Sequence, residues 1–461
     1  MKKTIVLLIV SFAMFMEAVD TTVINTAIPV MAKSLKVNPI DLKLALISYL
    51  LSLAIFIPIS GWIADKFGIK KVFIFAVLVF TLSSLWCGFT NKLWELVLAR
   101  IVQGIGGSLT MPIGRLIILR SFERHELIAK MSIVVMVASL GMMLGPLLGG
   151  VIVDHFSWHW IFWVNLPVGV LIVLMSMNLP ADEPAVFVPP LDVIGFILFG
   201  SGLATLTYGL SMFSESDISL TESVLTLILS ILLLIGYQRH SAYKQYPIVN
   251  VRLLSVPTFQ VAVIGNLLAR LGFGGMPFLL PLLLQIVLGF SPRLSGMLLA
   301  PVALGVFIVK PMSIYILRFL GYKTALILNT VLVGMSLWSF ILINQKTSIY
   351  TIGVQTFCYG FLIAFQYTAM NSLAYANLNN NDISSATSIM STIQQLAQSF
   401  GVAISAMMVG FFAYEFSSHQ VLTTVIFHYT FFMLGLFTLL SGSIFFRMKK
   451  EDGQELIGNT L

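Results

Sequence analysis

Charged residues are scarce in this sequence. Asp, Glu, Lys and Arg make up 10% of the 461 residues, whereas a soluble globular protein has about 25%. Apolar runs near the roughly 20 residues that cross a bilayer as a helix recur along the chain, and none shows the short alternation of a barrel strand. The composition therefore excludes a soluble globular protein and predicts an all-α polytopic membrane protein.

Motifs for covalent or nucleotide chemistry are missing as well. The two cysteines, Cys87 and Cys358, lie in separate apolar runs, which gives no disulfide framework and no CxxC metal site. No GxxxxGK[ST] loop is present for ATP, and no GxSxG elbow for a nucleophilic serine. In "HELIA", Ala129 replaces the second histidine of the zinc motif HExxH. We therefore expect no cofactor, no metal and no enzymatic activity, with an intramembrane enzyme as a remote alternative.

The apolar runs, bounded by charge, Gly, Pro or Asn, predict fourteen transmembrane helices. They are expected near residues 4–32, 42–63, 71–90, 93–119, 127–153, 160–180, 191–213, 220–238, 257–288, 294–316, 323–343, 348–376, 383–412 and 421–446. "GFGGMPFLLP" interrupts the ninth run, which predicts a broken helix there. The N-terminal run starts like a signal peptide but continues past Glu17 and Asp20, which favours a retained first helix.

The distribution of Lys and Arg predicts the topology. Most of the 26 basic residues lie in segments on the side of the N-terminus. The opposite side has Lys33, Lys36, Lys43, Lys92, Arg293 and Lys346. Because cytoplasmic loops are rich in basic residues, we expect both termini in the cytoplasm and the chain in the plasma (inner) membrane. The basic residues form no sustained cluster with aromatics, so nucleic acid is not an expected partner.

Two polar linkers divide the chain. They cover residues 180–190 and 237–252 and flank two helices without intramembrane charge, which predicts an insertion between two six-helix halves. We expect an N-terminal bundle over 1–180, two inserted peripheral helices with their linkers over 181–252, and a C-terminal bundle with a short tail over 253–461. "ADKFGIKK" after the second helix has a faint echo in "RFLGYK" after the tenth, as an internal repeat predicts.

Two carboxylates interrupt the first apolar run. Glu17 and Asp20 are three residues apart and share one face of the predicted helix. At ~1.5 Å per residue, Glu17 lies at about the depth of Arg100, which enters the bilayer from the opposite side on the fourth helix. A buried arginine costs ~3 kcal/mol to insert and needs a counter-charge. Glu17, Asp20 and Arg100 are therefore candidate proton-coupling residues, with a snorkelling Arg100 as the alternative.

The loop "GWIADKFGIKK" has the composition of a gate hinge. Gly61 and Gly68 permit close helix approach and a tight turn, and Asp65 can face the N-terminus of a neighbouring helix. Lys70 and Lys71 are expected at the cytoplasmic surface. An ordinary charged turn explains these residues about as well.

Glycines spaced by four residues mark the fifth helix. In "GMMLGPLLGG", Gly141, Gly145 and Gly149 form a groove on one helix face, and Pro146 leaves a backbone carbonyl unpaired. Gly150 completes a terminal pair of glycines. We expect a bent helix that packs closely against a neighbour, and a packing role alone is a competing explanation.

The second half of the chain has different intramembrane polar residues. Arg270 and Lys310 lie in predicted helices with no acidic residue in a neighbouring helix. These two side chains can pair with carboxylates of the first half, bind an anionic substrate, or extend to the membrane surface by snorkelling. Snorkelling is the preferred interpretation for Lys310. Asn25, Arg270 and Gln394 are candidates for lining a substrate cavity.

Five ordered segments carry a resemblance to a known family. "AVDTTVINTAIP", "GWIADKFGIKK", "LARIVQGIGGS", "GMMLGPLLGG" and "SWHWIFWVNLPVG" occur in the order found in the major facilitator superfamily, and nearly the whole chain resembles its fourteen-helix drug:proton antiporters. "SWHWIF", "ARLGFGGMPFLLPLLLQIVLGFSP" and "GYK" resemble the multidrug resistance protein D branch of that family. The resemblance implies the major facilitator fold, with two six-helix bundles and two inserted peripheral helices.

The resemblance also implies roles for single residues. Asp20 matches the acidic position of helix 1, Asp65 matches the gate aspartate, and Arg100 matches the helix 4 arginine that is linked to proton movement. The antiporter motif of the fifth helix is matched by Gly145, Pro146, Gly149 and Gly150.

Three residues depart from the family pattern. Arg318 stands where many relatives have a second gate aspartate, and Gln394 stands where many have arginine. Glu17 matches no standard family carboxylate. A complete second gate motif is therefore not expected, and the role of Glu17 rests on depth and spacing alone.

A proton-driven exporter accounts best for these features. Intramembrane carboxylates opposite an arginine are suited to proton coupling. The protonated carboxyl groups release the arginine and the ionised carboxylates bind it, so each protonation state favours one conformation. We expect drug:proton antiport of small amphipathic compounds by alternating access. The expected partners are protons, a small-molecule substrate and the lipid bilayer, and the expected functional unit is a monomer. Export of a native metabolite or siderophore, and proton symport on the same fold, are the alternatives.

Overall fold

The computed structural model describes residues 3–179, 188–213, 220–379, 382–416 and 421–457. All regular secondary structure in these ranges is helical, which confirms the all-α prediction. The chain separates into two compact units. Unit 1 comprises Met1–Leu191 and Phe290–Ala300, and unit 2 comprises Asp192–Gly289 and Pro301–Leu461.

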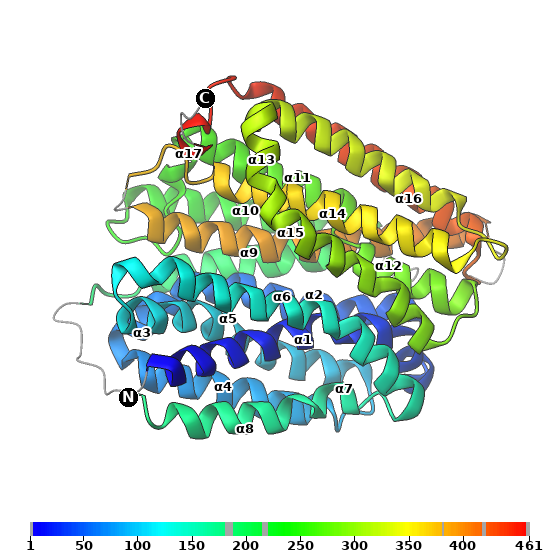
Figure 1. Cartoon of the computed structure of the whole chain (residues 1–461), viewed down its shortest axis with the longest axis horizontal. Helices are drawn as coiled ribbons and strands as arrows, with labels where there is room; N and C mark the ends of the chain where they lie inside the picture. Colours follow the sequence, from blue (N-terminus) through cyan, green and yellow to red (C-terminus); the bar gives the residue numbers. More distant parts are fainter. Residues whose placement is uncertain (1–2, 180–187, 214–219, 380–381, 417–420, 458–461) are drawn as a thin grey trace. The chain divides into compact units, whose positions relative to one another are not determined.

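Unit 1 is built from the first eight helices of the chain (Figure 1). They are α1 (Lys3–Leu35), α2 (Lys43–Phe56), α3 (Ser60–Phe67), α4 (Ile69–Cys87), α5 (Leu93–Ser121), α6 (Arg124–His155), α7 (Trp160–Trp163) and α8 (Asn165–Ser176). The 3₁₀ turn Ile57–Ile59, which contains a proline, joins α2 to α3. These two helices form one apolar segment, and α7 and α8 form another.

The core of unit 1 lies between α1, α4 and α5. Ile9, Phe73, Phe80 and Ile113 are fully buried there. Gly106 of α5 lies against the α4 backbone, where a Cβ built on it would be 2.7 Å from the amide nitrogen of Phe80. Because small residues let helix backbones approach closely in membrane proteins, this glycine fixes α5 tightly against α4.

Unit 2 contains the remaining helices. They are α9 (Val193–Met212), α10 (Leu220–Tyr243), α11 (Pro257–Phe273), α12 (Met276–Leu282), α13 (Pro292–Ser339, whose start belongs to unit 1), α14 (Ile349–Leu373), α15 (Ile383–Phe416), α16 (Thr424–Ser441) and the short α17 (Gln454–Ile457).

Two helices of this part of the chain are interrupted. α11 ends before Gly274 and Gly275, α12 follows, and a π-helical turn covers Leu283–Val287. The broken helix predicted for 257–288 is therefore confirmed. Within α13, Gly321 has a φ of +70° and a ψ of 161°, so two helices meet at a kink there.

The apolar segments agree with the predicted number of spans. Twelve helices in the described ranges are long and apolar enough to cross a membrane. One of them, Pro292–Leu342, contains the kink at Gly321, and a further shorter apolar helix covers Trp160–Ser176. Counting the kinked helix as two and including the shorter one gives fourteen apolar segments in the described part of the chain.

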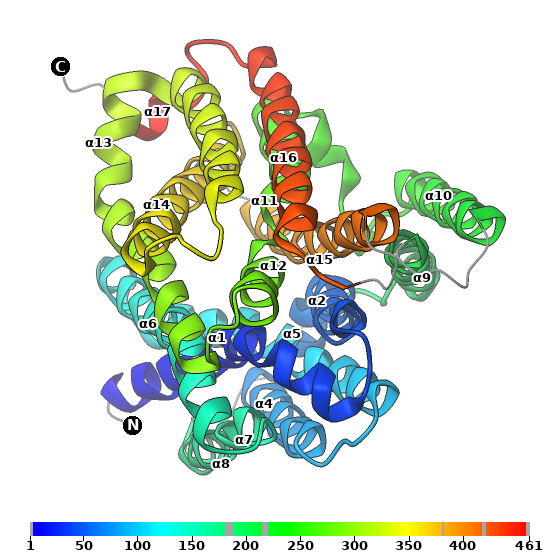
Figure 2. The ribbon, with the colours of Figure 1, turned by 90° about the vertical axis from the view of Figure 1, so that its right-hand side faces the viewer.

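The helices α9 and α10 form a pair beside α15 (Figure 2). Gly202 of α9 lies against Leu234 of α10, which lets the two helices pack closely. Asp192 caps α9 by accepting a hydrogen bond from the Gly195 amide at 3.1 Å, and its carboxylate also lies 2.7 Å from His240 of α10. In their most apolar stretches, 17% of the residues of α10 and 39% of those of α9 are buried, against 78% in the segment that begins with α11, so this pair lies at the edge of unit 2.

Candidate proton-coupling site

Asp20 lies in α1 and is fully buried. Its Oδ2 forms an ion pair with Nη1 of Arg100 on α5 at 2.7 Å. Its Oδ1 accepts hydrogen bonds from Gln103 Nε2 at 2.9 Å and from Asn165 Nδ2 at 2.8 Å. Because a buried carboxylate is costly unless it is paired and hydrogen-bonded, these donors from α5 and α8 are what makes an ionised Asp20 tolerable in an apolar helix.

Arg100 is enclosed as completely as its partner, with 1% of the residue exposed. Its Nη1 also donates to Gln103 Oε1 at 2.7 Å, and its Nε donates to the Ala45 carbonyl at 3.5 Å. The ring of Tyr49 on α2 lies 4.1 Å from the guanidinium carbon, a cation–π arrangement. Arg100 is therefore held among side chains in the interior, a geometry different from that of a snorkelling arginine.

Asn165 extends the site to a fourth helix. Its Nδ2 also donates to Ser84 Oγ of α4 at 3.0 Å, and Ser84 Oγ donates to the Phe162 carbonyl at 2.9 Å. The contacts of one carboxylate thus connect α1, α5, α8 and α4.

Glu17 is buried three residues before Asp20 but faces a different neighbour. It forms no ion pair within the described residues, and its Oε2 has no hydrogen-bond partner there. A Cβ built on Gly107 of α5 would lie 3.7 Å from Glu17 Oε1 and 3.1 Å from the hydroxyl of Tyr49. The structure therefore brings Asp20, and not Glu17, to Arg100.

Asp65 lies near the end of α3 and pairs with Arg120 of α5, with 3.8 Å between Oδ1 and Nη2. Both side chains are about half exposed, at 50% and 54%. Arg120 belongs to the last turn of α5, so within unit 1 Asp65 lies beside the C-terminal end of that helix. Lys71 is exposed. A Cβ built on Gly61 would meet no described residue of unit 1 within 4 Å.

Gly68 and Lys70 shape the turn between α3 and α4. Gly68 has a φ of +88°, in the left-handed region that favours glycine. Lys70 Nζ donates to the carbonyls of Met177 and Leu179, each at 2.7 Å. The lysine therefore satisfies carbonyls that follow the C-terminal end of α8, where a cation is favoured.

The corresponding motif in unit 2 has the same local geometry. Gly321 has a φ of +70°, and Lys323 Nζ donates to the carbonyls of Phe446 at 3.1 Å and Met448 at 2.6 Å. Each lysine thus binds carbonyls that follow the C-terminal end of the last membrane helix of its unit, α8 in unit 1 and α16 in unit 2. The residue three positions before the glycine differs, because Arg318 replaces the aspartate of unit 1.

The glycine groove of α6 receives α1. A Cβ built on Gly141 would lie 2.8 Å from the Phe15 carbonyl, and one built on Gly145 would lie 3.2 Å from the Val23 amide. Gly149 lies against the carbonyl of Val23. The close packing predicted from the spacing is present, and it sets the position of the helix that carries Asp20.

An adjacent face of the same motif contacts the start of α13 within unit 1. Gly150 lies against the Pro292 carbonyl, at 2.5 Å from a built Cβ. The carbonyl of Pro146, inside α6, lies against Gly296. Each of the two glycines therefore allows backbone contact that a larger residue would prevent.

The three cavity candidates lie apart in the chain. Asn25 is on α1 with 9% of the residue exposed. Arg270 on α11 is 8% exposed, and its Nη1 donates to Gln398 Oε1 at 3.2 Å. Gln394 on α15 donates to Asn371 Oδ1 at 3.1 Å. The structure brings Arg270 and Gln394 into neighbouring polar contacts of unit 2, whereas Asn25 belongs to unit 1.

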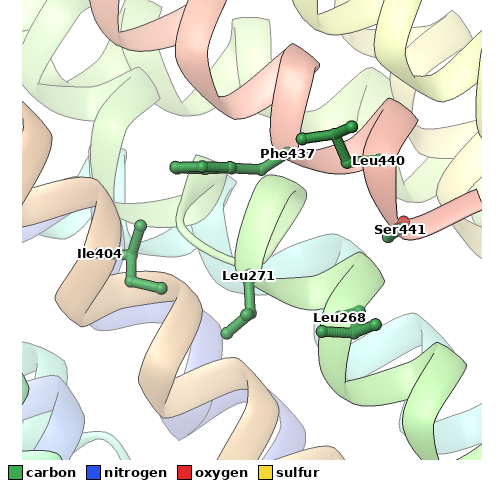
Figure 3. A pocket seen from close by; sticks show the side chains of 6 residues that line it. All are labelled: Leu268, Leu271, Ile404, Phe437, Leu440 and Ser441. Carbon is green, nitrogen blue, oxygen red and sulfur yellow. The ribbon is translucent and has the colours of Figure 1, made fainter.

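An apolar cavity of about 210 Å³ lies between α11, α15 and α16. Figure 3 shows the side chains that line it, which are Leu268, Leu271, Ile404, Phe437, Leu440 and Ser441. Ser441 is its one polar lining residue, so this cavity offers no charge to a substrate or a proton.

Sequence reasoning missed Gln103, Asn165 and Tyr49. Gln103 carried a usable signal, because it follows Arg100 by three residues and so shares its helix face. Asn165 and Tyr49 reach the ion pair from other helices, and no local pattern indicates this.

The fold and the buried ion pair define a multi-pass helical membrane protein with the architecture of a secondary transporter. The chain belongs to the Major Facilitator Superfamily, whose family profile matches residues 10–402. It has the major facilitator fold, with two six-helix bundles and two inserted helices.

Relatives with transporter names cover nearly the whole chain. The sequence is 35% identical over 444 residues to the protein of Pectobacterium atrosepticum designated multidrug resistance protein MdtD, which covers 96% of this chain and 95% of that protein. It is 34% identical over 448 residues to the transport protein HsrA of Haemophilus influenzae, covering 97% and 96% of the two chains.

Solved structures of transporters share the fold. A peptide transporter POT in complex with sulfate matches with a TM-score of 0.72 and 16% identity, over 98% of this chain and 96% of that one. A D-xylose–proton symporter matches with a TM-score of 0.70 and 15% identity, over 98% and 99%. At such low identities the likeness establishes the fold alone.

Proposed function

We propose that this chain is a proton-coupled secondary transporter that exports small amphipathic compounds in exchange for protons. The observation that carries the proposal is the buried ion pair of Asp20 and Arg100, a carboxylate held by a cation inside the membrane part of the fold. The names of the relatives, a multidrug resistance protein and a transport protein, support the same class of activity.

Protonation of Asp20 is the coupling step of this mechanism. An ionised Asp20 holds Arg100, Gln103 and Asn165 by three short contacts. A proton on the carboxylate removes the charge that attracts Arg100 and turns one acceptor oxygen into a donor. The helices that share the network then favour a second arrangement, and loss of the proton restores the first.

Alternating access would follow from rocking of the two six-helix bundles about a central substrate site. The hinge at Gly68, with its lysine bonded to the end of α8, and the equivalent hinge at Gly321 would be cytoplasmic gate elements. The exposed pair of Asp65 and Arg120 would open and close with the gate, since such a pair is weak enough to break repeatedly.

The chain would reside in the plasma (inner) membrane as a monomer with both termini in the cytoplasm. The excess of Lys and Arg in the loops on the side of the N-terminus supports this orientation. Protons and a small molecule would be its transported partners, without nucleic acid and without enzymatic chemistry.

The test uses the purified full chain in proteoliposomes with an imposed pH gradient, where a panel of amphipathic compounds is screened for substrate-evoked proton movement. Wild-type protein should couple the two fluxes, and Asp20→Asn should keep its fold but lose proton movement. Asp154→Asn, the same substitution at a partly exposed aspartate near the end of α6, is the matched control. Normal proton exchange in Asp20→Asn would contradict the proposal, and proton-linked uptake into right-side-out cells would replace antiport by symport.

A further inference from the structure

α11, α14 and α15 of unit 2 present a polar surface that the proton-coupling site does not use. Each helix contributes two polar side chains four residues apart, and this spacing places both on one helix face. The six residues, named here the unit 2 polar wall, are Asn266 and Arg270 of α11, Tyr367 and Asn371 of α14, and Gln394 and Gln398 of α15.

The first layer of the wall consists of three amides. Asn371 Oδ1 accepts hydrogen bonds from Gln394 Nε2 at 3.1 Å and from Asn266 Nδ2 at 3.4 Å. Asn266 is fully buried, and its Oδ1 has no hydrogen-bond partner within the described residues. This layer is neutral and can both donate and accept hydrogen bonds.

The second layer contains the positive charge. Arg270 Nη1 donates to Gln398 Oε1 at 3.2 Å, and the ring of Tyr367 lies 3.8 Å from the guanidinium carbon. Gln398 Nε2 donates in turn to the Gly274 carbonyl at 2.5 Å, at the break between α11 and α12. The amide oxygen of Gln398 is thereby fixed toward the arginine.

Arg270 lacks a counter-charge in the described structure. It is more than nine-tenths buried, its Nε has no hydrogen-bond partner among the described residues, and no ion pair forms there. The sequence has no Asp or Glu between Glu222 and Asp382, so neither α11 nor α14 can supply one. An amide oxygen and an aromatic face compensate a buried guanidinium only in part.

The wall has an accessible side. Tyr367, Asn371, Gln394 and Gln398 are each only partly buried, although Asn266 and Arg270 behind them are buried. A ligand that reaches the wall meets amides and a phenol first, with the guanidinium next to them.

We infer that the unit 2 polar wall binds the anionic group of the transported compound, with Arg270 pairing to a carboxylate. The inference rests on the proposed function and narrows the substrate class to amphipathic carboxylates. The forked donors of a guanidinium match a planar carboxylate, and the orphaned Nε supplies one of the two donors of such a fork. The amide layer then hydrogen-bonds polar groups next to the carboxylate.

The test is a binding titration with two probes that differ only in charge. Dansylglycine carries a carboxylate, and dansylglycinamide carries a neutral amide at the same place. Purified full-length protein in lipid nanodiscs is titrated with each probe at neutral pH, and dansyl fluorescence reports binding. Wild-type protein should bind the carboxylate about tenfold more tightly than the amide, the usual effect of a charge-assisted hydrogen bond.

The variants assign this preference to the wall. Arg270→Gln should remove it, and Arg270→Lys should keep part of it because the charge remains without the fork. Gln398→Leu is a second, independent variant. It keeps the guanidinium but removes its hydrogen bond to Gln398, so it should weaken the preference for the carboxylate probe. Arg447→Gln, the same substitution at an exposed arginine of unit 2, is the control and should bind like wild type.

Equal affinity of wild-type protein for both probes would overturn the inference, as would an unchanged preference in Arg270→Gln. Failure of the proposed function gives a different pattern, because the titration uses no pH gradient. A preference that depends on Arg270 without proton-linked transport would contradict only the antiport proposal. Proton-linked transport with no dependence of probe binding on Arg270 would contradict only the role of the wall.

Discussion

Each of the two units buries an arginine, but the two arginines lie on different helices of their units and have different partners. In unit 1, Arg100 lies on the fourth membrane helix and pairs with Asp20 of the first. In unit 2, Arg270 lies on the first helix of the second six-helix set and stacks on Tyr367 of the fourth. The buried arginine therefore lies on the fourth helix in unit 1 and on the first helix in unit 2. No carboxylate in the described part of unit 2 pairs with Arg270 as Asp20 pairs with Arg100.

The turns at Gly68 and Gly321, unlike the buried arginines, have the same geometry in the two units. A glycine with positive φ is followed two residues later by a lysine that caps the end of the last membrane helix, in unit 1 at Gly68 and in unit 2 at Gly321. The repeat therefore keeps the backbone geometry while the intramembrane charges differ. In our proposal the proton is bound in unit 1, whereas the buried arginine of unit 2 has no ion-pair partner among the described residues and is left for the substrate.

Breaking the ion pair of unit 1 should have the largest effect on stability. Arg100→Gln leaves the Asp20 carboxylate buried without a counter-charge, and such a change costs about 3–5 kcal/mol of the free energy of unfolding. Adding Asp20→Asn to this variant removes the stranded charge, so the double variant should be more stable than Arg100→Gln alone. Denaturant unfolding of purified protein gives the double-mutant cycle, and strictly additive losses would show that the two side chains do not interact.

The two hinges should respond alike to the same substitution. Gly68→Ala and Gly321→Ala each place a Cβ on a residue with positive φ and extended ψ, a backbone conformation that favours glycine, which costs about 1–3 kcal/mol. Thermal unfolding of both variants measures the cost. A loss at one hinge only would break the symmetry between the units, and Gly61→Ala, at an open position with ordinary backbone, is the control.

Removing the arginine of unit 2 should cost little or nothing. Arg270→Gln takes away a buried charge that has no ion-pair partner in the described structure. The free energy of unfolding should therefore fall by less than about 1 kcal/mol, or it should rise. The same unfolding assay compares it with Arg100→Gln. A loss as large as that in unit 1 would mean that Arg270 has a structural counter-charge, and the contrast between the units would fail.

The smallest effect on stability is expected at the exposed gate pair. Asp65 and Arg120 are about half exposed, and surface pairs contribute about 0.2–1 kcal/mol. Asp65→Asn should therefore unfold nearly like wild type and yet slow substrate exchange in proteoliposomes, because a gate contact is lost. An unchanged exchange rate would remove Asp65 from the gate.

The sequence predicts the helices well because their apolar runs are long and are bounded by charged residues, Gly, Pro or Asn. The break at Gly274 follows from the letters "GFGGMP", and the packing of α6 follows from glycines spaced by four. Depth along the first helix matches Glu17 to Arg100, and the three-residue spacing brings Asp20 onto nearly the same helix face.

Depth does not fix the direction in which a side chain points. Three residues of helix leave Glu17 and Asp20 about 60° apart around α1, enough to turn one carboxylate toward Gly107 and the other toward Arg100. The same limitation hides Asn165 and the unit 2 polar wall, because their contacts depend on how several helices pack. Only the four-residue spacing of polar residues on α11, α14 and α15 hints at the wall.

The most direct test separates proton movement from substrate exchange in the same proteoliposomes, with dansylglycine as the probe. Asp20→Asn should lose substrate-evoked proton movement but still exchange the probe across the membrane when no pH gradient is present. Arg270→Gln should lose probe exchange itself. Loss of both activities in Asp20→Asn together with full exchange in Arg270→Gln would contradict the assignment of the proton to unit 1 and of the substrate charge to unit 2.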